Sequence, residues 1–244
     1  ARFIWAGPIA AVYLFSLHQY SPTAIPTFNA SFWGFVIGAS SMQILATGLM
    51  VKLFKMQNYA IGAGLAKSEA LVAAILGVIF FGTQLSILGW IGVVIGGLAV
   101  MLLSSKQGFK QLSLKTVLLG LACGSAFALT SLWVREASLT LQGPFTHRAA
   151  WVLLWVIGLQ TIVLIGYLLA KDKSTLAALW QRPKLTLAIS VSSCIGSIGW
   201  FSAMSLQAVP YVKTLGQVEV FFTLIIATFW LKQKVKINDV AGLL

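Results

Sequence analysis

The feature that most constrains this chain is a series of apolar runs, each about 20 residues long, that follow one another along the whole sequence. A run of that length matches an α-helix that crosses the hydrocarbon core of a bilayer. Hydrophobic residues make up 59% of the sequence and charged residues only 9%, too few to coat a water-facing surface. The sequence therefore predicts an all-α integral membrane protein. The predicted spans are residues 1–18, 31–51, 57–81, 85–104, 115–134, 146–170, 185–206 and 210–231, and a further helix begins near residue 237.

The basic residues are distributed unevenly between alternate connectors of these helices. The net charge of +12 would suit a nucleic-acid binder only if Lys and Arg gathered on a polar face, so nucleic acid is not an expected partner. If neighbouring helices run antiparallel, thirteen basic residues fall on one side of the membrane and three on the other. The positive-inside rule predicts that the side with thirteen is cytoplasmic. The thirteen are Arg2, Lys52, Lys55, Lys106, Lys110, Lys115, Lys171, Lys173, Arg182, Lys184, Lys232, Lys234 and Lys236; the three are Arg135, Arg148 and Lys213.

One long internal similarity relates the two ends of the chain. Residues 66–92 align without a gap on residues 216–242 when the sequence is shifted by 150 positions, and Glu69 then coincides with Glu219. The shift predicts ten helices as two five-helix repeats, of which this sequence lacks the first helix and the end of the last. An odd number of helices in a repeat inverts the second copy, which is typical of transporters with a site near the bilayer midplane. The predicted halves are residues 1–104 and 105–244.

Two segments carry a common pattern of a polar or acidic position, an aliphatic stretch, a short turn and a final helix with glycine. They are KSEALVAAILGVIFFGTQLSILGWIGVVIGGLAV in the first half and AVPYVKTLGQVEVFFTLIIATFWLKQKVKINDVAGLL in the second, where GQVEVFFTLI is the most specific piece. Both halves resemble the EamA-type repeat of the drug/metabolite transporter superfamily, and the opening ARFIWA resembles the start of that family's second helix. The resemblance implies a ten-helix bundle around a central cavity that exports or exchanges small polar metabolites. It also implies a bacterial inner-membrane location, no cofactor, and a monomer or weak dimer.

Two charged residues, Lys67 and Glu69, lie inside a predicted span. Each charge costs on the order of 2.5–3.5 kcal/mol at the centre of a membrane helix. Residues two positions apart lie about 200° apart around a helix, so each of the two needs its own partner. One interpretation is a structural ion pair, for example Lys67 with Glu219, that holds the halves together. The other is a substrate site, because charges inside membranes are commonly functional.

Further polar candidates lie at similar depth in other predicted spans. Gln217 is the repeat mate of Lys67, and the remaining candidates come from the spans 31–51 and 185–206. Serines in membrane helices commonly hydrogen-bond to their own backbone, which is the alternative for two of them. Cys123 and Cys194 lie in separate apolar segments and are expected to pack as free thiols. The candidate substrate-binding residues are Lys67, Glu69, Glu219, Gln217, Gln43, Ser41, Ser193 and Trp200.

The sequence lacks the common enzyme motifs, such as HExxH, GxSxG and a phosphate-binding glycine loop, and no metal site is expected. We expect a secondary active transporter that works by alternating access on a small polar metabolite. An amino acid or similar zwitterion fits best, because a lysine can hold a carboxylate while glutamates hold an ammonium group. The alternatives are a proton-coupled exporter of cationic drugs, a nucleotide-sugar-type exchanger and, from another class, a channel or a non-transporting membrane scaffold. The expected partners are the small-molecule substrate and the lipid bilayer, with a coupling proton in the drug-exporter alternative.

Overall fold

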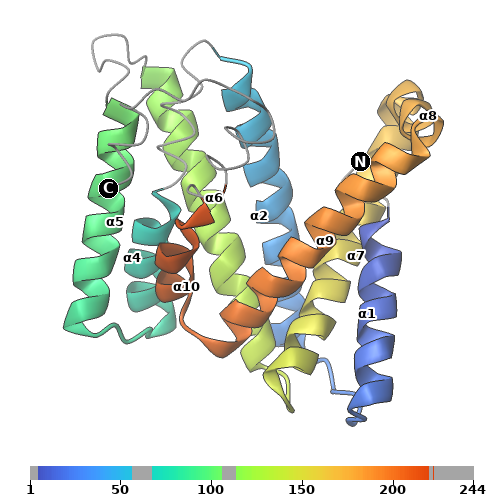
Figure 1. Cartoon of the computed structure of the whole chain (residues 1–244), viewed down its shortest axis with the longest axis horizontal. Coiled ribbons are helices and arrows are strands. Elements are labelled where there is room, and N and C mark those ends of the chain that lie inside the picture. The colour runs from blue at the N-terminus through green and yellow to red at the C-terminus, as the bar shows by residue number, and fades with distance from the viewer. Residues whose placement is uncertain (1–4, 57–67, 106–113, 220–221, 223–244) are drawn as a thin grey trace. The chain divides into compact units, whose positions relative to one another are not determined.

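The computed structural model describes residues 5–56, 68–105, 114–219 and 222, and every regular element in these ranges is a helix (Figure 1). The helices are α1 (Ala6–Tyr20), α2 (Ala30–Phe54), α4 (Glu69–Phe81), α5 (Ile87–Ser105), α6 (Leu114–Leu139), α7 (Phe145–Lys171), α8 (Lys173–Gln181), α9 (Pro183–Leu206) and α10 (Val209–Gly216). Four of them, α2, α6, α7 and α9, are long and apolar enough to cross a membrane. The prediction of an all-helical membrane protein is confirmed at this level.

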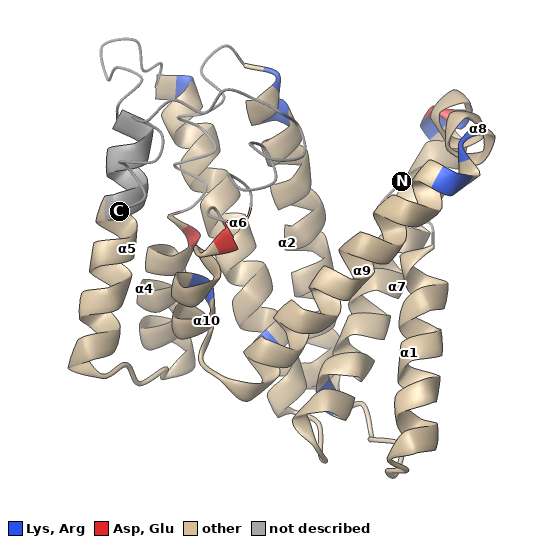
Figure 2. Ribbon diagram, in the orientation of Figure 1, with Lys and Arg blue, Asp and Glu red and all other residues tan. Residues whose placement is uncertain are grey.

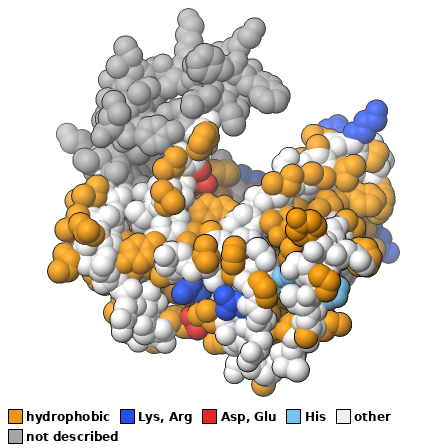
Figure 3. Space-filling model, turned by 60° about the horizontal axis from the view of Figure 1, so that its bottom comes forward, with side chains coloured by type: hydrophobic (Ala, Val, Ile, Leu, Met, Phe, Trp, Pro, Cys, Tyr) orange, Lys and Arg blue, Asp and Glu red, His pale blue; other side chains and the backbone are white. Residues whose placement is uncertain are grey.

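Apolar side chains of α7 lie on its outer surface as well as in the core, unlike those of a water-soluble helix. Gln160 is completely buried, whereas Ile162, two positions further along, is 70% exposed. Large apolar side chains are exposed on α1 and α9 as well, for example Phe15 and Ile195. Figure 3 shows one face of the molecule with hydrophobic side chains over much of its described surface and charged ones at few positions. Polar groups inside and apolar groups outside are what a lipid environment requires.

The helix ends are fixed by local sequence. The Asn29 side chain accepts a hydrogen bond of 2.8 Å from the Phe32 backbone N–H and so caps the start of α2. Pro183 and Pro210 lie in the first turns of α9 and α10, where the missing N–H of proline removes no helical bond. Gly82 follows α4 with φ of 60°, a left-handed conformation that glycine adopts without steric cost.

The chain forms two compact units. The first consists of residues 1–44 and 130–207, in which α1, α7 and α9 pack against one another and α8 contacts α7 and α9. The second consists of residues 45–129 and 208–244, in which α4, α5 and α10 pack together. Each unit contains residues from both predicted halves. The division into repeats 1–104 and 105–244 therefore stays a prediction.

The C-terminus of α9 is capped by two arginines within the first unit. Arg135 of α6 donates Nη1 hydrogen bonds of 2.9 Å to the Met204 carbonyl and 2.6 Å to the Gln207 carbonyl. Arg148 of α7 donates one of 3.4 Å to the Ser205 carbonyl. The last carbonyls of a helix lack intrahelical donors and carry partial negative charge, so cations are favourable there. Two of the three basic residues on the charge-poor side of the predicted membrane therefore have a structural use.

One glycine of α2 permits a close contact in the first unit. A Cβ atom added at Gly38 would lie 2.7 Å from Cε3 of the Trp133 indole on α6, closer than real Cβ atoms approach. At Gly34, one turn earlier, an added Cβ would meet no atom within 4 Å. A larger side chain at position 38 would therefore collide with Trp133, whereas one at position 34 has free space for its Cβ atom.

The predicted span 57–81 is only partly described. Its described portion is α4, which begins at Glu69 with Ser68 as its N-cap residue, and residues 57–67 lie outside the described ranges. The expectation that Glu69 lies in the middle of a helix is wrong, because it is the first residue of α4. The apolar run continued through Ser68, so hydropathy alone did not indicate this boundary.

The predicted continuous helix 210–231 is also wrong at one point. α10 ends at Gly216, residues 217–218 form a turn, and Glu219 is helical again, while most of the residues that follow lie outside the described ranges. Glycine at position 216 lowers the helix propensity there by about 1 kcal/mol relative to alanine, which favours an interruption. The turn residues Ser68 and Val218 are related by the shift of 150 positions, and in both places a glutamate follows the turn.

Candidate functional site

The start of α4 and the end of α10 bring together an ion pair in the second unit. The Lys213 Nζ atom lies 2.6 Å from the Glu69 Oε1 atom, and the two side chains are only 14% and 16% exposed. Lys213 belongs to the last turn of α10 and Glu69 opens α4. Figure 2 shows that charged residues are sparse along the helices around this point. The pair is thus a concentrated polar feature within a mostly apolar group of helices.

The two members of the pair lie at helix ends of opposite polarity. The N-terminus of a helix carries partial positive charge and its C-terminus partial negative charge. Glu69 at the start of α4 and Lys213 near the end of α10 each lie where the helix dipole stabilises their charge. Pairing and dipoles together offset part of the cost of placing Glu69 in an apolar segment. Glu69 therefore has the partner that the sequence required, although the residue is Lys213, which was counted among the three basic residues on the charge-poor side of the predicted membrane.

Three buried polar atoms of residues close to the pair in the sequence have no hydrogen-bond partner among the described residues. They are Ser68 Oγ, Thr214 Oγ1 and Gln217 Nε2. Ser68 precedes Glu69, Thr214 follows Lys213, and Gln217 lies in the turn after α10. A buried polar atom left unsatisfied costs about 1–3 kcal/mol, so such groups are rare unless they serve a purpose. Hydroxyl and amide groups can donate hydrogen bonds to a carboxylate or accept them from an ammonium group.

The second unit also fixes the opposite face of α10 against α5. The Tyr211 hydroxyl accepts a hydrogen bond of 2.9 Å from the Ser86 backbone N–H, and its ring lies against Gly89. Gln217 Oε1 lies 2.7 Å from where a Cβ atom at Gly96 would stand. The glycines of α5 therefore allow the close approach that holds α10 and the turn after it in place.

The other predicted site residues of this unit are placed as follows. Glu219 is helical and exposed, two positions beyond Gln217. Lys67 lies outside the described residues, so its pairing with Glu219 stays a prediction. Gln217, predicted as its repeat mate, lies one helical turn beyond Lys213, on the same stretch of chain as the ion pair.

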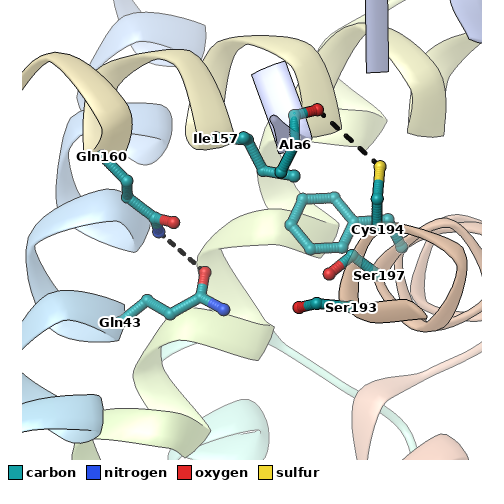
Figure 4. Close-up of a pocket in the computed structure, with 8 residues that line it drawn as sticks. Ala6, Gln43, Ile157, Gln160, Ser193, Cys194 and Ser197 are labelled. Carbon is teal, nitrogen blue, oxygen red and sulfur yellow. Dashed lines mark hydrogen bonds between the residues drawn. The ribbon is translucent and has the colours of Figure 1, made fainter. Parts of the chain in front are cut away.

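A second polar feature is a recess in the first unit, between α1, α2, α7 and α9 (Figure 4). Gln160 of α7 donates an Nε2 hydrogen bond of 2.8 Å to Gln43 Oε1 of α2, and the Gln160 Oε1 atom is buried without a partner. In Figure 4 the hydroxyl groups of Ser193 and Ser197 lie across from the two glutamines. The recess admits no water-sized sphere in this conformation. Its lining residues are Ala6, Gln43, Ile157, Gln160, Ser193, Cys194, Ser197 and Phe201.

Two predicted site residues of the first unit lie outside this lining. Ser41 is exposed, and its hydroxyl donates a hydrogen bond of 2.8 Å to the Ile37 carbonyl one turn earlier on α2. Ser40 makes the same kind of bond, 2.7 Å long, to the Val36 carbonyl. Both serines thus bond to the backbone of their own helix, and Ser40 also donates to the Val156 carbonyl of α7 at 3.3 Å. Trp200 of α9 is half-buried. Of the predicted candidates, Gln43 and Ser193 line the recess together.

Sequence reasoning missed Lys213 and Gln160. Lys213 was counted as a topology signal, although it lies only six positions before Glu219 in the same predicted span. Gln160 is a lone amide within the apolar run WVLLWVIGLQTIVLIGYLL. An uncharged polar residue near the centre of such a run is itself an indication of an inward-facing position, and that signal was available.

Both cysteines are free and buried, as predicted. Cys194 Sγ lies 3.8 Å from the Ala6 carbonyl in the wall of the recess. Cys123 lies in the second unit, in a cluster with Leu53, and its Sγ is 3.4 Å from the Ala46 carbonyl. The chain thus carries one native thiol at the recess and one in a hydrophobic cluster of the other unit.

Comparison with known proteins adds no family to this description. No protein-family model matches the sequence, and no curated protein sequence matches it either.

Proposed function

We propose that this protein is a secondary active transporter that exports or exchanges a small zwitterionic metabolite, most simply an amino acid, by alternating access. The observation that carries the proposal is the buried Glu69–Lys213 ion pair at the adjoining ends of two helices. Charged residues inside membrane segments are expensive and commonly mark substrate or ion pathways. Interrupted helices at corresponding positions of two repeats are the usual location of a transporter's site.

A zwitterion can replace this ion pair charge for charge. Its carboxylate takes the place of Glu69 at the Lys213 ammonium group, and its ammonium group takes the place of Lys213 at the Glu69 carboxylate. The exchange keeps both buried charges paired, which avoids the large cost of an isolated buried charge. The unpartnered Ser68 and Thr214 hydroxyls and the Gln217 amide supply further hydrogen bonds to the substrate.

We extend the proposal to the architecture of the whole protein. It comprises ten helices in two inverted five-helix repeats of the EamA type, in a bacterial inner membrane with the lysine-rich connectors in the cytoplasm. The sequence similarity between residues 66–92 and 216–242 supports the repeat. The glutamates that follow a turn at both related positions, Glu69 and Glu219, support it further.

The test is counterflow of radiolabelled amino acids in proteoliposomes that contain the purified full chain. We expect saturable exchange of at least one zwitterionic amino acid. Glu69→Gln and Lys213→Met should each abolish this exchange, because either change leaves one end of the substrate without its counter-charge. Lys173→Met on the exposed helix α8 removes a charge away from the site and is the matched control, which should keep full exchange.

Three outcomes would contradict the proposal in different ways. Exchange that persists unchanged in both ion-pair variants would show that the pair is structural. Absence of amino-acid exchange together with accumulation of a cationic drug driven by a proton gradient would favour the drug-exporter alternative, in which Glu69 carries the proton. Unsaturable flux of all solutes would indicate a channel.

A further inference from the structure

The recess of the first unit, lined by the eight residues named above, contains a hydrogen-bond acceptor that none of the described residues uses. Gln160 is completely buried, its Nε2 group bonds to Gln43, and its Oε1 atom has no partner. The link between α2 and α7 needs only the Nε2 group. Packing alone would be served equally well by a methionine of similar shape, which has no strong acceptor to bury. The orphaned carbonyl oxygen is therefore a feature that calls for a ligand.

The lining of the recess is polar but uncharged. Across from the glutamines, α9 contributes the Ser193 and Ser197 hydroxyls, which lie toward them in Figure 4. None of the lining residues is ionisable except the thiol of Cys194. A charged ligand group would lose its hydration here without gaining a counter-charge, so a neutral group is favoured.

We propose that this recess is a binding site for a small neutral compound that carries a primary carboxamide group. Such a group donates N–H to Gln160 Oε1, and its carbonyl accepts a hydrogen bond from a serine hydroxyl on the opposite wall. A carboxylate of the same shape presents an oxygen to Gln160 Oε1 and cannot donate to it. Discrimination between an amide and its matching acid is therefore the signature of this site. The proposal does not depend on the transport proposed above, which rests on residues of the other unit.

Binding requires the recess to open, because its closed form admits no water-sized sphere. Separation of α9 from α1 and α7 would open it, and this motion also uncovers the Cys194 thiol, now only 1% exposed. A bound carboxamide fills the opened space in front of that thiol. Cys194 is thus a native reporter of occupancy, and Cys123, buried in the other unit, is the matched control within the same molecule.

The test measures alkylation of both cysteines by N-ethylmaleimide in the purified full chain, read by mass spectrometry of the two peptides. Two pairs of probes, each with one neutral amide, differ only in amide against acid: nicotinamide with nicotinate, and benzamide with benzoate. We expect the amides to slow modification of Cys194 and leave Cys123 unchanged, while the acids slow neither. In Gln160→Met the concentration of nicotinamide needed for half-protection should rise by about tenfold, the effect of one lost hydrogen bond to a buried group.

Thermal unfolding provides the second readout, because a ligand that binds the folded state raises the melting temperature. Nicotinamide should raise it for the wild type and for Ser41→Ala, which alters a serine outside the lining, but less for Gln160→Met and Ser197→Ala. Equal effects of amide and acid, or equal protection in Gln160→Met that retains the wild-type helical content, would overturn the proposal. So would the absence of both protection and thermal shift with every carboxamide. Because nicotinamide is not a zwitterion, protection by it without any amino-acid transport would uphold this site and refute the transport proposal.

Discussion

The Glu69–Lys213 pair gives the most quantitative prediction, a double-mutant cycle on stability. Lys213→Met removes the cation that pairs with Glu69, whose side chain is only 16% exposed in the wild type. Breaking a buried pair by removing one partner destabilises a protein by about 3–5 kcal/mol, and the residual exposure places this case near the lower end of that range. Glu69→Gln should cost about as much, because it leaves the Lys213 ammonium group without its carboxylate.

The double variant Glu69→Gln/Lys213→Met should be more stable than either single variant. Replacement of both members of a buried pair by uncharged groups of similar volume is often close to neutral, since no uncompensated charge remains. The sum of the two single effects, about 6 kcal/mol, should then exceed the double effect by about 5 kcal/mol, well above the 0–1 kcal/mol typical of exposed pairs.

The assay is the free energy of unfolding from denaturant titration in mixed micelles, followed by circular dichroism. Lys173→Met on exposed α8 is the control and should lie within about 0.5 kcal/mol of the wild type. If the single effects add up to the double effect within about 0.5 kcal/mol, Glu69 and Lys213 are not coupled, and both the energetic reasoning and the transport proposal built on it fail.

Three further predictions follow. Gly38→Leu should destabilise the chain by about 1–3 kcal/mol because its side chain collides with the indole packed there, whereas Gly34→Leu, facing open space, should not; denaturant titration compares them. Asp172, which accepts hydrogen bonds from two residues of the first turn of α8, has its pKa lowered to about 2. Its stabilising effect on α8 is therefore complete above the ordinary pKa of about 3.9 and is lost as the pH falls through about 2, and the carbonyl chemical shift of labelled Asp172 should titrate at that lower pH. Cysteines introduced at Lys173 and Gln84 should react from opposite sides of sealed vesicles, Lys173→Cys from the cytoplasmic side; labelling of Lys173→Cys from outside would reverse the predicted sidedness.

The sequence predicts those features of the fold that depend on a single segment of the chain. Apolar runs of sufficient length predicted α2, α6, α7 and α9, because in lipid a segment must satisfy its backbone within a helix whatever its neighbours are. Gln43 and Ser193 could also be selected as candidates from the sequence, since a polar side chain in an apolar run is expected to face inward.

Helix ends within an apolar run could not be predicted from the sequence, since the hydropathy is the same on both sides of such an end. The turn at residues 217–218 and the start of α4 at Glu69 interrupt runs that remain apolar on both sides. Contacts with other helices help to decide such boundaries, here the Tyr211 hydrogen bond to Ser86 and the Gln217 contact with Gly96.

The sequence by itself determined that this chain is an all-helical membrane protein and that Glu69 needs a partner, because a buried charge has a cost that does not depend on the fold. Only the tertiary structure decided which partner it has. Lys213 is 144 positions away in the sequence, and only the packing of α10 against α4 places it 2.6 Å from Glu69. The same holds for Gln160, whose bond to Gln43 spans 117 positions. Which distant residues pair depends on how the helices pack. Neither the amino-acid composition nor the hydrophobic periodicity of one helix contains that information.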